Sequence, residues 1–454
     1  MSASNGMRIY RPFWLVLVVF VYCITASFLP SSFVLFGHQF KPVDFFSDFK
    51  KTKKKTPRKK VHLQHKGKTA ADSLHYTGIA FENFNETETP LFQQFCDKLK
   101  LDKKPTQKVH IAWFGDSMVE GDILLQDLRT KLQDQFGGDG IGFVPITSVT
   151  GNFRQTIYTL NSGNWQTVSI LKQQECKLPL GIGGEAFIPQ DGSWVSFSAV
   201  NRPHLNFFTE VQLFVLTNNQ PLTLTVLIDD KSEQTIAVAA SSSLQVIPIG
   251  STTAFHKIKV TFTGSTTAYV YGLNFENGNG VYLDNFGLRG SSGVAMGSLR
   301  PDSLLYQWAN KHPYDLLILE YGLNVVTPET KSFEWYETSF PRAIQRMKQV
   351  YSKAAVLELS IGDRSIRKDG VYATLEQVLP FIEIQRNIAQ KEHLVFWNMY
   401  EVMGGDSSMI HWVNQKPALA NKDYTHINSN GGAVMGEKLF DALLFEVRKQ
   451  KLHL

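Results

Sequence analysis

The chain has 454 residues, of which 43% are hydrophobic and 19% are charged. This composition excludes a disordered chain, and the length predicts more than one folded region, each with a real core. The net charge of +5 is smaller than the positive charge of one basic run, residues 50–60. The rest of the chain is therefore slightly acidic, and no nucleic-acid partner is expected.

An uncharged apolar segment, residues 13–29, follows Arg8 and Arg11 near the start of the chain. It has about the minimum length of a membrane-spanning helix, and the chain could continue it with a kink at Pro30. No small-residue cleavage site follows. We therefore expect residues 1–36 to form an uncleaved transmembrane anchor, with a cleaved signal peptide as the alternative.

Residues 37–75 are polar and basic and lack apolar periodicity, which predicts a flexible linker. Its basic run, Lys50–Lys60, is either a solvated tether or a contact for anionic lipid or an acidic wall polymer. No metal-ligand spacing occurs among the cysteines, Cys23, Cys96 and Cys176. A disulfide between the last two and a pair of free thiols both remain open.

From about residue 107 onward, apolar strands alternate with amphipathic helices. Residues 108–115 form a continuous apolar run that ends in glycine, and residues 122–136 place Leu124, Leu128, Leu132 and Phe136 at helical spacing. The same alternation returns in the last third of the chain, with strands expected at 314–322, 354–362 and 393–399 and helices at about 333–351, 370–391 and 430–451. Strands that are apolar throughout predict a parallel sheet covered on both faces.

The sequence pattern between residues 150 and 280 differs from that of the α/β region. Short β-branched runs follow one another here, separated by Gly, Asn, Asp and Ser, with no helical stretch. This pattern predicts an all-β sandwich of jelly-roll-like type. The sandwich interrupts the α/β domain, which is therefore built from residues 76–149 and 281–454.

Gly-Asp-Ser at residues 115–117 places Ser117 directly after a predicted buried strand. A serine attacks an acyl carbon only when a base takes its proton and the base is held in the correct tautomer. Asp423 and His426, three residues apart before the last helix, could supply this pair. Taken alone, they could equally be polar residues at a helix start.

Two further residues could donate to an oxyanion. Asn324 directly follows the expected strand that ends in Gly322, and Gly290 lies on a loop where the α/β domain resumes. Each could be an ordinary turn residue. Their joint placement after strands favours a site, because ligands of open α/β sheets bind at the carboxyl ends of the strands.

The Gly-Asp-Ser motif, the loop with Gly290, Asn324 after its strand, and Asp423 with His426 before the last helix resemble, in order and spacing, the four sequence blocks of the SGNH, or GDSL-like, hydrolases. The resemblance covers residues 107–148 and 282–454. The resemblance implies a three-layer, flavodoxin-like domain. Ser117 would be the nucleophile and a backbone donor, Gly290 and Asn324 would complete the oxyanion hole, His426 would be the base, and Asp423 would orient it. No metal and no cofactor are expected.

Two features depart from a simple match to this family. Val325 stands after Asn324, where many relatives carry an acidic residue, so the acceptor specificity stays open. Gly287 or Gly293, instead of Gly290, could be the glycine that corresponds to the second of the four family blocks.

The inserted sandwich makes the chain similar to peptidoglycan O-acetylesterases. This likeness implies a serine esterase that removes O-acyl groups, with acetyl favoured, from a cell-envelope polysaccharide. Such a substrate places the catalytic region on the periplasmic or extracellular side of an inner-membrane anchor. The alternatives are an O-acyltransferase acting on glycans, an inactive glycan-binding or scaffold protein, and a lipid-ester hydrolase.

Overall fold

The structure is a computed structural model that describes residues 33–35, 38–40, 76–84, 90–151, 153–264 and 267–452. The expected membrane segment, residues 13–29, and nearly all of the expected linker lie outside these residues. Within the described ranges, no helix combines the length and the apolar character that crossing a bilayer requires.

The chain divides into two units, residues 1–70 with 367–372 and residues 71–366 with 373–454. In the first unit, β1 (Phe33–Leu35) pairs antiparallel with β2 (His38–Phe40), with Phe33 opposite Phe40. The sequence allowed the expected membrane helix to extend beyond Pro30, but residues 33–35 form a strand and do not continue it.

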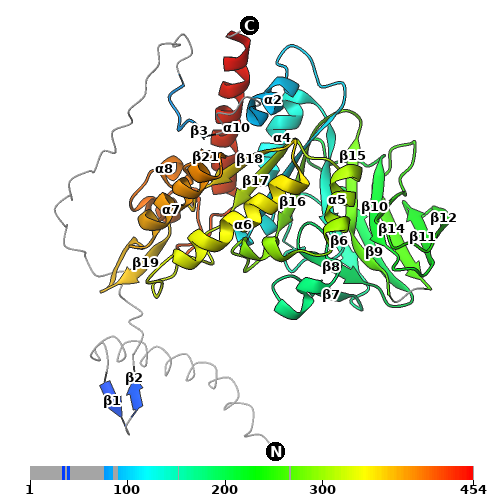
Figure 1. The fold of residues 1–454 in the computed structure, drawn as a ribbon, viewed down its shortest axis with the longest axis horizontal. Helices are drawn as coiled ribbons and strands as arrows, with labels where there is room; N and C mark the ends of the chain where they lie inside the picture. Colours follow the sequence, from blue (N-terminus) through cyan, green and yellow to red (C-terminus); the bar gives the residue numbers. More distant parts are fainter. Residues whose placement is uncertain are drawn as a thin grey trace, which may run out of the picture. The chain divides into compact units, whose positions relative to one another are not determined.

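The second unit contains the predicted parallel sheet (Figure 1). Its five parallel strands, in spatial order, are β16 (Gly280–Gly287), β4 (Lys108–Gly115), β17 (Leu316–Glu320), β18 (Ala355–Leu359) and β21 (Val395–Trp397). The short β3 (Glu82–Asn83) adds an antiparallel edge. Numbered along the chain, the parallel strands run 2-1-3-4-5, which is the flavodoxin-like order.

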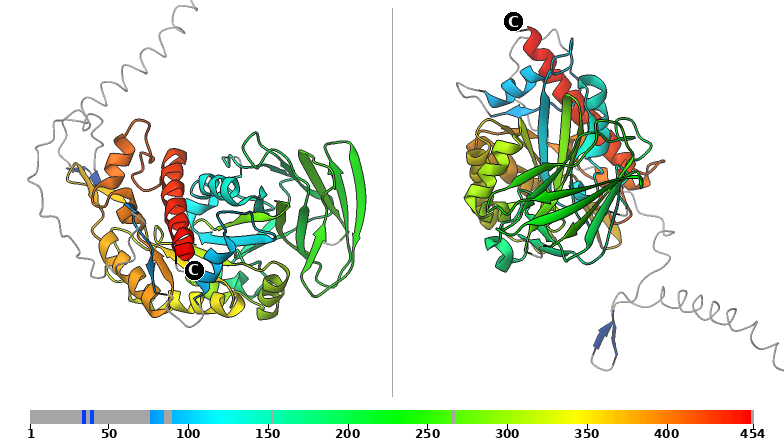
Figure 2. Two further views of the ribbon diagram at one scale, coloured as in Figure 1. Left: turned by 90° about the horizontal axis from the view of Figure 1, so that it is seen from above. Right: turned by 90° about the vertical axis from the view of Figure 1, so that its right-hand side faces the viewer.

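Helices lie on both faces of this sheet (Figure 2). One face carries α2 (Leu91–Lys98), α4 (Leu125–Phe136) and α10 (Ser429–Leu452). The other carries α5 (Asp302–Lys311), α6 (Glu334–Val350) and α7 (Val378–Lys391). The shorter helices are α3 (Ser117–Glu120), α8 (Met399–Met403), α9 (Ser408–Asn414) and the 3₁₀ turns η2 (Gln173–Lys177) and η3 (Val294–Ser298).

The inserted region is a sandwich of two antiparallel sheets around its own apolar core. The first sheet contains β5 (Asp139–Pro145), β7 (Gln166–Ser169), β8 (Glu185–Ile188), β10 (Val211–Leu216), β13 (Gln245–Pro248) and β15 (Tyr269–Asn277). The second contains β6 (Tyr158–Asn161), β9 (Ser193–Ser198), β11 (Leu222–Ile228), β12 (Ser232–Val238) and β14 (Lys257–Thr263).

An aromatic cluster joins the sandwich to the α/β domain. Trp308 of α5 is buried and contacts Phe143, Phe214 and Tyr271 of the first sheet, with ring centroids 5.7, 4.9 and 5.4 Å apart. Burying aromatic rings of this size contributes strongly to stability. The first sheet therefore packs these rings into the core of the α/β domain, while the sandwich keeps a separate core between its own two sheets.

Two boundaries differ from the sequence-based expectation. The sandwich begins at β5, because this strand pairs with β15, whereas we had placed residues up to 149 in the α/β domain. The helix expected from residue 370 starts at Val378. Asp369 and Gly370, both with positive φ, instead form the turn of a hairpin between β19 (Ser365–Lys368) and β20 (Val371–Thr374).

The two described cysteines, Cys96 and Cys176, are free thiols. The thiol of Cys176 donates to the carbonyl oxygen of Ile170 at 3.2 Å. Of the two alternatives left open by the sequence, the structure contains the unpaired one.

Candidate active site

Ser117 is the first residue of α3, directly beyond the carboxyl end of β4. A glycine is required two residues earlier, because a Cβ on Gly115 would lie 2.3 Å from Cγ2 of Val119 and 2.9 Å from the carbonyl oxygen of Glu320. The strand order reverses between β4 and β17, which is where an open α/β sheet forms its ligand crevice. The fold thus places Ser117 at this crevice.

The structure brings Ser117 together with His426 and Asp423, although more than 300 residues separate the serine from the other two. The Oγ of Ser117 lies 3.0 Å from Nε2 of His426, and Nδ1 of His426 lies 2.9 Å from Oδ2 of Asp423. The carboxylate can only accept, so Nδ1 donates to it and Nε2 is left to accept the proton of the serine. This is the geometry of a nucleophile, a base and an orienting acid.

The loop that carries Asp423 and His426 is held in a tight turn. Oδ1 of Asp423 accepts from the backbone N–H groups of Thr425 and His426, at 2.9 and 3.0 Å. Tyr424 has a positive φ of 56°, which lets the chain fold back over the carboxylate. One carboxylate therefore fixes both the loop and the imidazole.

The same contacts keep Asp423 ionised. Partial burial would raise the pKa of Asp423, but the two backbone N–H groups and the imidazole outweigh this effect and hold the pKa below its ordinary value. The side chains of His426 and Asp423 are 35% and 49% exposed. A polymeric substrate can therefore approach the site from solvent.

Asn324 lies in the same cluster, beyond the end of β17. Its Nδ2 donates to Oδ2 of Asp116 at 3.1 Å and to the carbonyl oxygen of Ser291 at 3.0 Å. Both amide hydrogens are thus engaged in this structure. An oxyanion at the serine would have to share one of them.

Gly290 lies on the loop that follows β16. The N–H of Leu288 on this loop donates to the carbonyl oxygen of Gly115 at 2.8 Å, which ties the loop to the turn that carries Ser117, here called the serine turn. A Cβ on either rival glycine would collide with its surroundings: 2.3 Å from the nitrogen of Glu120 for Gly287, and 2.7 Å from two aromatic rings for Gly293. A Cβ on Gly290 would meet nothing closer than 3.9 Å. Packing thus explains the other two glycines, and the space beside Gly290 is open.

Asp116 is the buried carboxyl behind the serine. Its Oδ1 accepts from the N–H of Met118 at 3.0 Å, which caps α3, and its Oδ2 accepts from Asn324. Burial raises the pKa of Asp116 to about 6, an effect that the Met118 N–H and His426 only partly offset. The residue thus links the serine turn to Asn324.

This raised pKa predicts a pH dependence of stability. The unfolded carboxyl deprotonates near pH 3.8 and the folded one near 6, so between these values the unfolded state binds fewer protons. The free energy of unfolding of the wild type, relative to Asp116→Asn, should therefore fall by a few kcal/mol as the pH rises through this window. Urea unfolding of both proteins between pH 4 and 7 measures this difference. A difference that stayed constant would show that Asp116 does not titrate in this range.

A second buried carboxylate, Asp122, supports the end of the serine turn. It forms two bonds with Arg129, at 2.7 and 2.9 Å, and lies 3.5 Å from Arg154. Nδ2 of Asn285 donates to Asp122 at 3.0 Å and to the carbonyl oxygen of Val119 at 2.8 Å. These contacts connect α3, α4 and β16 beneath the site.

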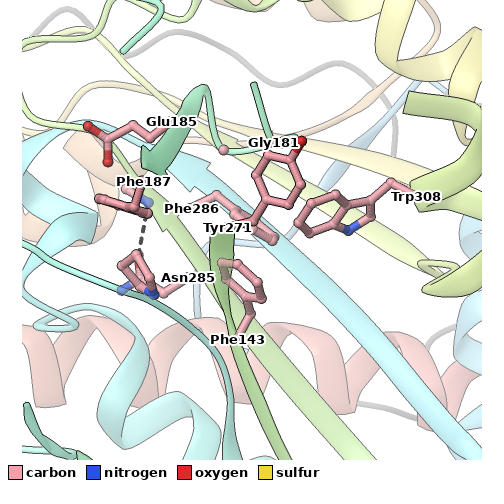
Figure 3. A pocket seen from close by; sticks show the side chains of 11 residues that line it. Phe143, Gly181, Glu185, Phe187, Tyr271, Asn285, Phe286 and Trp308 are labelled. Carbon is pink, nitrogen blue, oxygen red and sulfur yellow. Dashed lines mark hydrogen bonds between the residues drawn. The ribbon is translucent and has the colours of Figure 1, made fainter. Parts of the chain in front are cut away.

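A pocket opens beside β16, between the parallel sheet and the sandwich (Figure 3). In this view the rings of Tyr271, Phe143 and Trp308 lie on one side, and the carboxyl of Glu185 lies on the other. Burial, and next the charge of Glu120, raise the pKa of Glu185 to about 7. The pocket therefore combines aromatic walls with a carboxyl that both donates and accepts near neutral pH.

Sequence patterns identified Ser117, Asn324 and the Asp423–His426 pair as site residues, but they did not identify the buried residues that hold these in position. Asp116 belongs to the Gly-Asp-Ser motif and Asp122 lies shortly after it, yet each bonds to an asparagine more than 160 residues away, Asn324 and Asn285. Glu185 stands on β8 of the sandwich, and no sequence pattern singled it out. A buried carboxyl carries no local sequence signal of its own.

No protein-family model matches the sequence, and no curated protein matches it. A solved structure of a peptidoglycan O-acetylesterase aligns with a TM-score of 0.65 at 22% identity, over 81% of this chain and 99% of that chain.

Two family two carbohydrate esterases also align, with a TM-score of 0.26 each. The one from Cellvibrio japonicus has 10% identity over 64% of this chain and 98% of its own. The one from Clostridium thermocellum, in complex with cellohexaose, has 11% identity over 65% and 99%. These two alignments are too weak to inform the fold. The chain has the fold of the peptidoglycan O-acetylesterase, which confirms the likeness predicted from the sequence.

Proposed function

We propose that this protein is a serine esterase of the SGNH type that removes O-acyl groups, chiefly O-acetyl, from a cell-envelope polysaccharide such as peptidoglycan. The hydrogen-bonded chain Ser117–His426–Asp423 at the sheet crevice carries the proposal. The fold shared with a peptidoglycan O-acetylesterase supports the choice of substrate class.

In the proposed reaction, Oγ of Ser117 attacks the ester carbonyl while Nε2 of His426 takes its proton. The backbone N–H groups of Ser117 and Gly290, with the amide of Asn324, stabilise the oxyanion. His426 then protonates the departing sugar oxygen, which leaves as a hydroxyl, and a water molecule activated by the same base releases the acyl group. Asp423 stabilises the imidazolium throughout.

An acyltransferase would use the same residues, with a sugar hydroxyl in place of the water. The open site, in which His426 is 35% exposed, admits either acceptor. An inactive scaffold is less well supported, because a serine hydrogen-bonded to a histidine that is itself held by a carboxylate is the arrangement of an activated nucleophile.

The decisive experiment incubates the full chain with O-acetylated peptidoglycan and measures released acetate, beside Ser117→Ala. Hydrolysis predicts free acetate with the wild type alone. Acetyl groups recovered on an added sugar would identify a transferase instead. Binding of the glycan without loss of acetyl groups would favour the scaffold and overturn the esterase.

We further propose that residues 1–36 anchor the chain in the inner membrane and that the catalytic unit lies on the periplasmic or extracellular side, where such a polymer is found. The run Lys50–Lys60 would then lie between the membrane and an anionic lipid or wall polymer. A topology reporter fused after residue 60 tests this placement. A cytoplasmic signal would remove the wall substrate and leave the esterase chemistry untouched.

A further inference from the structure

A second cluster of titratable side chains lies at the opposite end of the parallel sheet from Ser117. His110 is near the start of β4, Glu276 is on β15 of the sandwich, and His312 caps the end of α5. All three are buried, and one ligand atom from each lies within 4.8 Å of the other two. The proposed ester chemistry uses none of them.

Each histidine of this cluster has one ring nitrogen held by an acceptor. Nδ1 of His110 lies 3.2 Å from the carbonyl oxygen of Pro313, so it donates and leaves the lone pair on Nε2 of the neutral ring. Nε2 of His312 lies 2.8 Å from Oδ2 of Asp284, so it donates there and leaves the lone pair on Nδ1. Metal-binding histidines typically donate their other ring N–H to a carbonyl or a carboxylate in this way.

The freed nitrogen of His110 faces a carboxylate oxygen. Its Nε2 lies 3.0 Å from Oε1 of Glu276, and neither atom has another hydrogen-bond partner within the described part of the chain. The other oxygen, Oε2, is held by Nζ of Lys108 at 3.2 Å. Two buried lone pairs this close repel each other unless a cation lies between them, and that cation is either a proton or a metal ion.

We propose that His110, His312 and Glu276 bind a zinc ion. Two imidazole nitrogens and one carboxylate oxygen are a common zinc ligand set, and water can fill a fourth position. Tetrahedral bonds of about 2.0–2.1 Å hold ligand atoms about 3.3 Å apart, so the widest separation must close by no more than about 1.5 Å. Small side-chain rotations suffice for this movement.

A zinc ion here would join the parallel sheet to the sandwich, because His110 and Glu276 come from different parts of the unit. It would act as a structural link between the interrupted domain and its insertion, and it does not depend on the proposed esterase activity. The ligands stand at positions 110, 276 and 312, so no short motif marks the site in the sequence.

The test uses the full chain, stripped with a chelator and then loaded with zinc or cobalt alone. We expect about one zinc per chain by mass spectrometry of the metal, and cobalt absorption bands typical of a tetrahedral nitrogen–oxygen site. Zinc should also raise the thermal unfolding temperature of the stripped protein. A folded wild type that retains neither metal would show that a shared proton joins His110 and Glu276, and the proposal would be overturned.

Variants locate the ion. Glu276→Gln keeps the shape of the side chain and removes its charge, and His110→Gln removes a ligand; both should reduce bound zinc about tenfold or more. His256→Ala is the control, because His256 is 72% exposed and pairs loosely with Asp229, at 3.9 Å. Zinc retained in full by the two ligand variants would place it elsewhere and contradict the proposal. If a variant does not fold, the cobalt spectrum of the wild type decides.

Discussion

Replacing Ser117 or His426 with alanine is expected to lower the turnover of a chromogenic acetyl ester by about four to six orders of magnitude. Without Oγ no acyl-enzyme forms, and without Nε2 at 3.0 Å no base takes the serine proton. The two losses should not add, because each variant disables the same step. The double variant should therefore be no slower than the worse single one.

The control for this experiment is a histidine beside an aspartate on the sandwich, outside the Ser117 site. His256, near Asp229 on the sandwich, meets this description, and His256→Ala should retain full turnover. Activity that survived in Ser117→Ala would exclude Ser117 as the nucleophile. An inactive wild type would move the choice to the transferase or to the scaffold.

Asn324→Ala should have a smaller effect, about two to three orders of magnitude, because removing one oxyanion donor leaves the other donors and the nucleophile in place. Both hydrogens of its amide are engaged with Asp116 and Ser291 in this structure. A loss as large as that of Ser117→Ala would instead indicate that Asn324 holds the serine turn in position through Asp116.

The fold was largely predictable from the sequence because its signals are strong and local. Apolar runs such as residues 108–115 are buried on both faces, and this pattern identifies parallel strands without tertiary information. The start of the sandwich was placed too late because β5, with two glycines and a proline in its sequence, gives little strand signal; only its pairing with β15 assigns it. Pairing between strands 130 residues apart leaves no local trace.

In the candidate site, too, the residues in local motifs could be predicted from the sequence, whereas those that depend on distant partners could not. Ser117, Asn324, Asp423 and His426 could be found because each follows a strand, or precedes the last helix, in a recognisable motif. The buried carboxyl groups behind them could not be interpreted, because the role of a carboxylate depends on its partners. Asp122 is the clearest example, since it looks like an ordinary turn residue in the sequence and lies at the centre of a buried charge cluster.

Replacing Asp122 with alanine should lower the free energy of unfolding by about 3–5 kcal/mol. The change would leave Arg129 and Arg154 buried, with side chains 1% and 5% exposed, and without their counter-charge. Burial alone would raise the pKa of Asp122, but the two arginines and Asn285 hold it well below its usual range. The stabilisation is therefore fully present at pH 7, and it would be lost only as the pH falls towards this lowered pKa.

The chain contains a matched control at Asp230. Asp122 and Asp230 both adopt a left-handed backbone conformation, with φ of 63° and 56°, so alanine imposes the same backbone penalty at each. Asp230 pairs with Lys257 at 2.8 Å, but the two side chains are 59% and 39% exposed. Asp230→Ala should therefore cost about 1 kcal/mol or less beyond that shared penalty.

Chemical unfolding of both alanine variants at pH 7 separates the buried charge cluster from the backbone effect, because the backbone penalty cancels in the difference. Equal losses would show that the cluster adds nothing. A larger loss for Asp122→Ala would instead assign to this carboxylate the energy that holds α3 against α4 and β16. Asp122→Asn then tests the charge alone, since the amide keeps the shape and tolerates the left-handed conformation. If charge dominates, Asp122→Asn should lose most of what Asp122→Ala loses, and the serine turn that rests on this cluster should lose its rigidity with it.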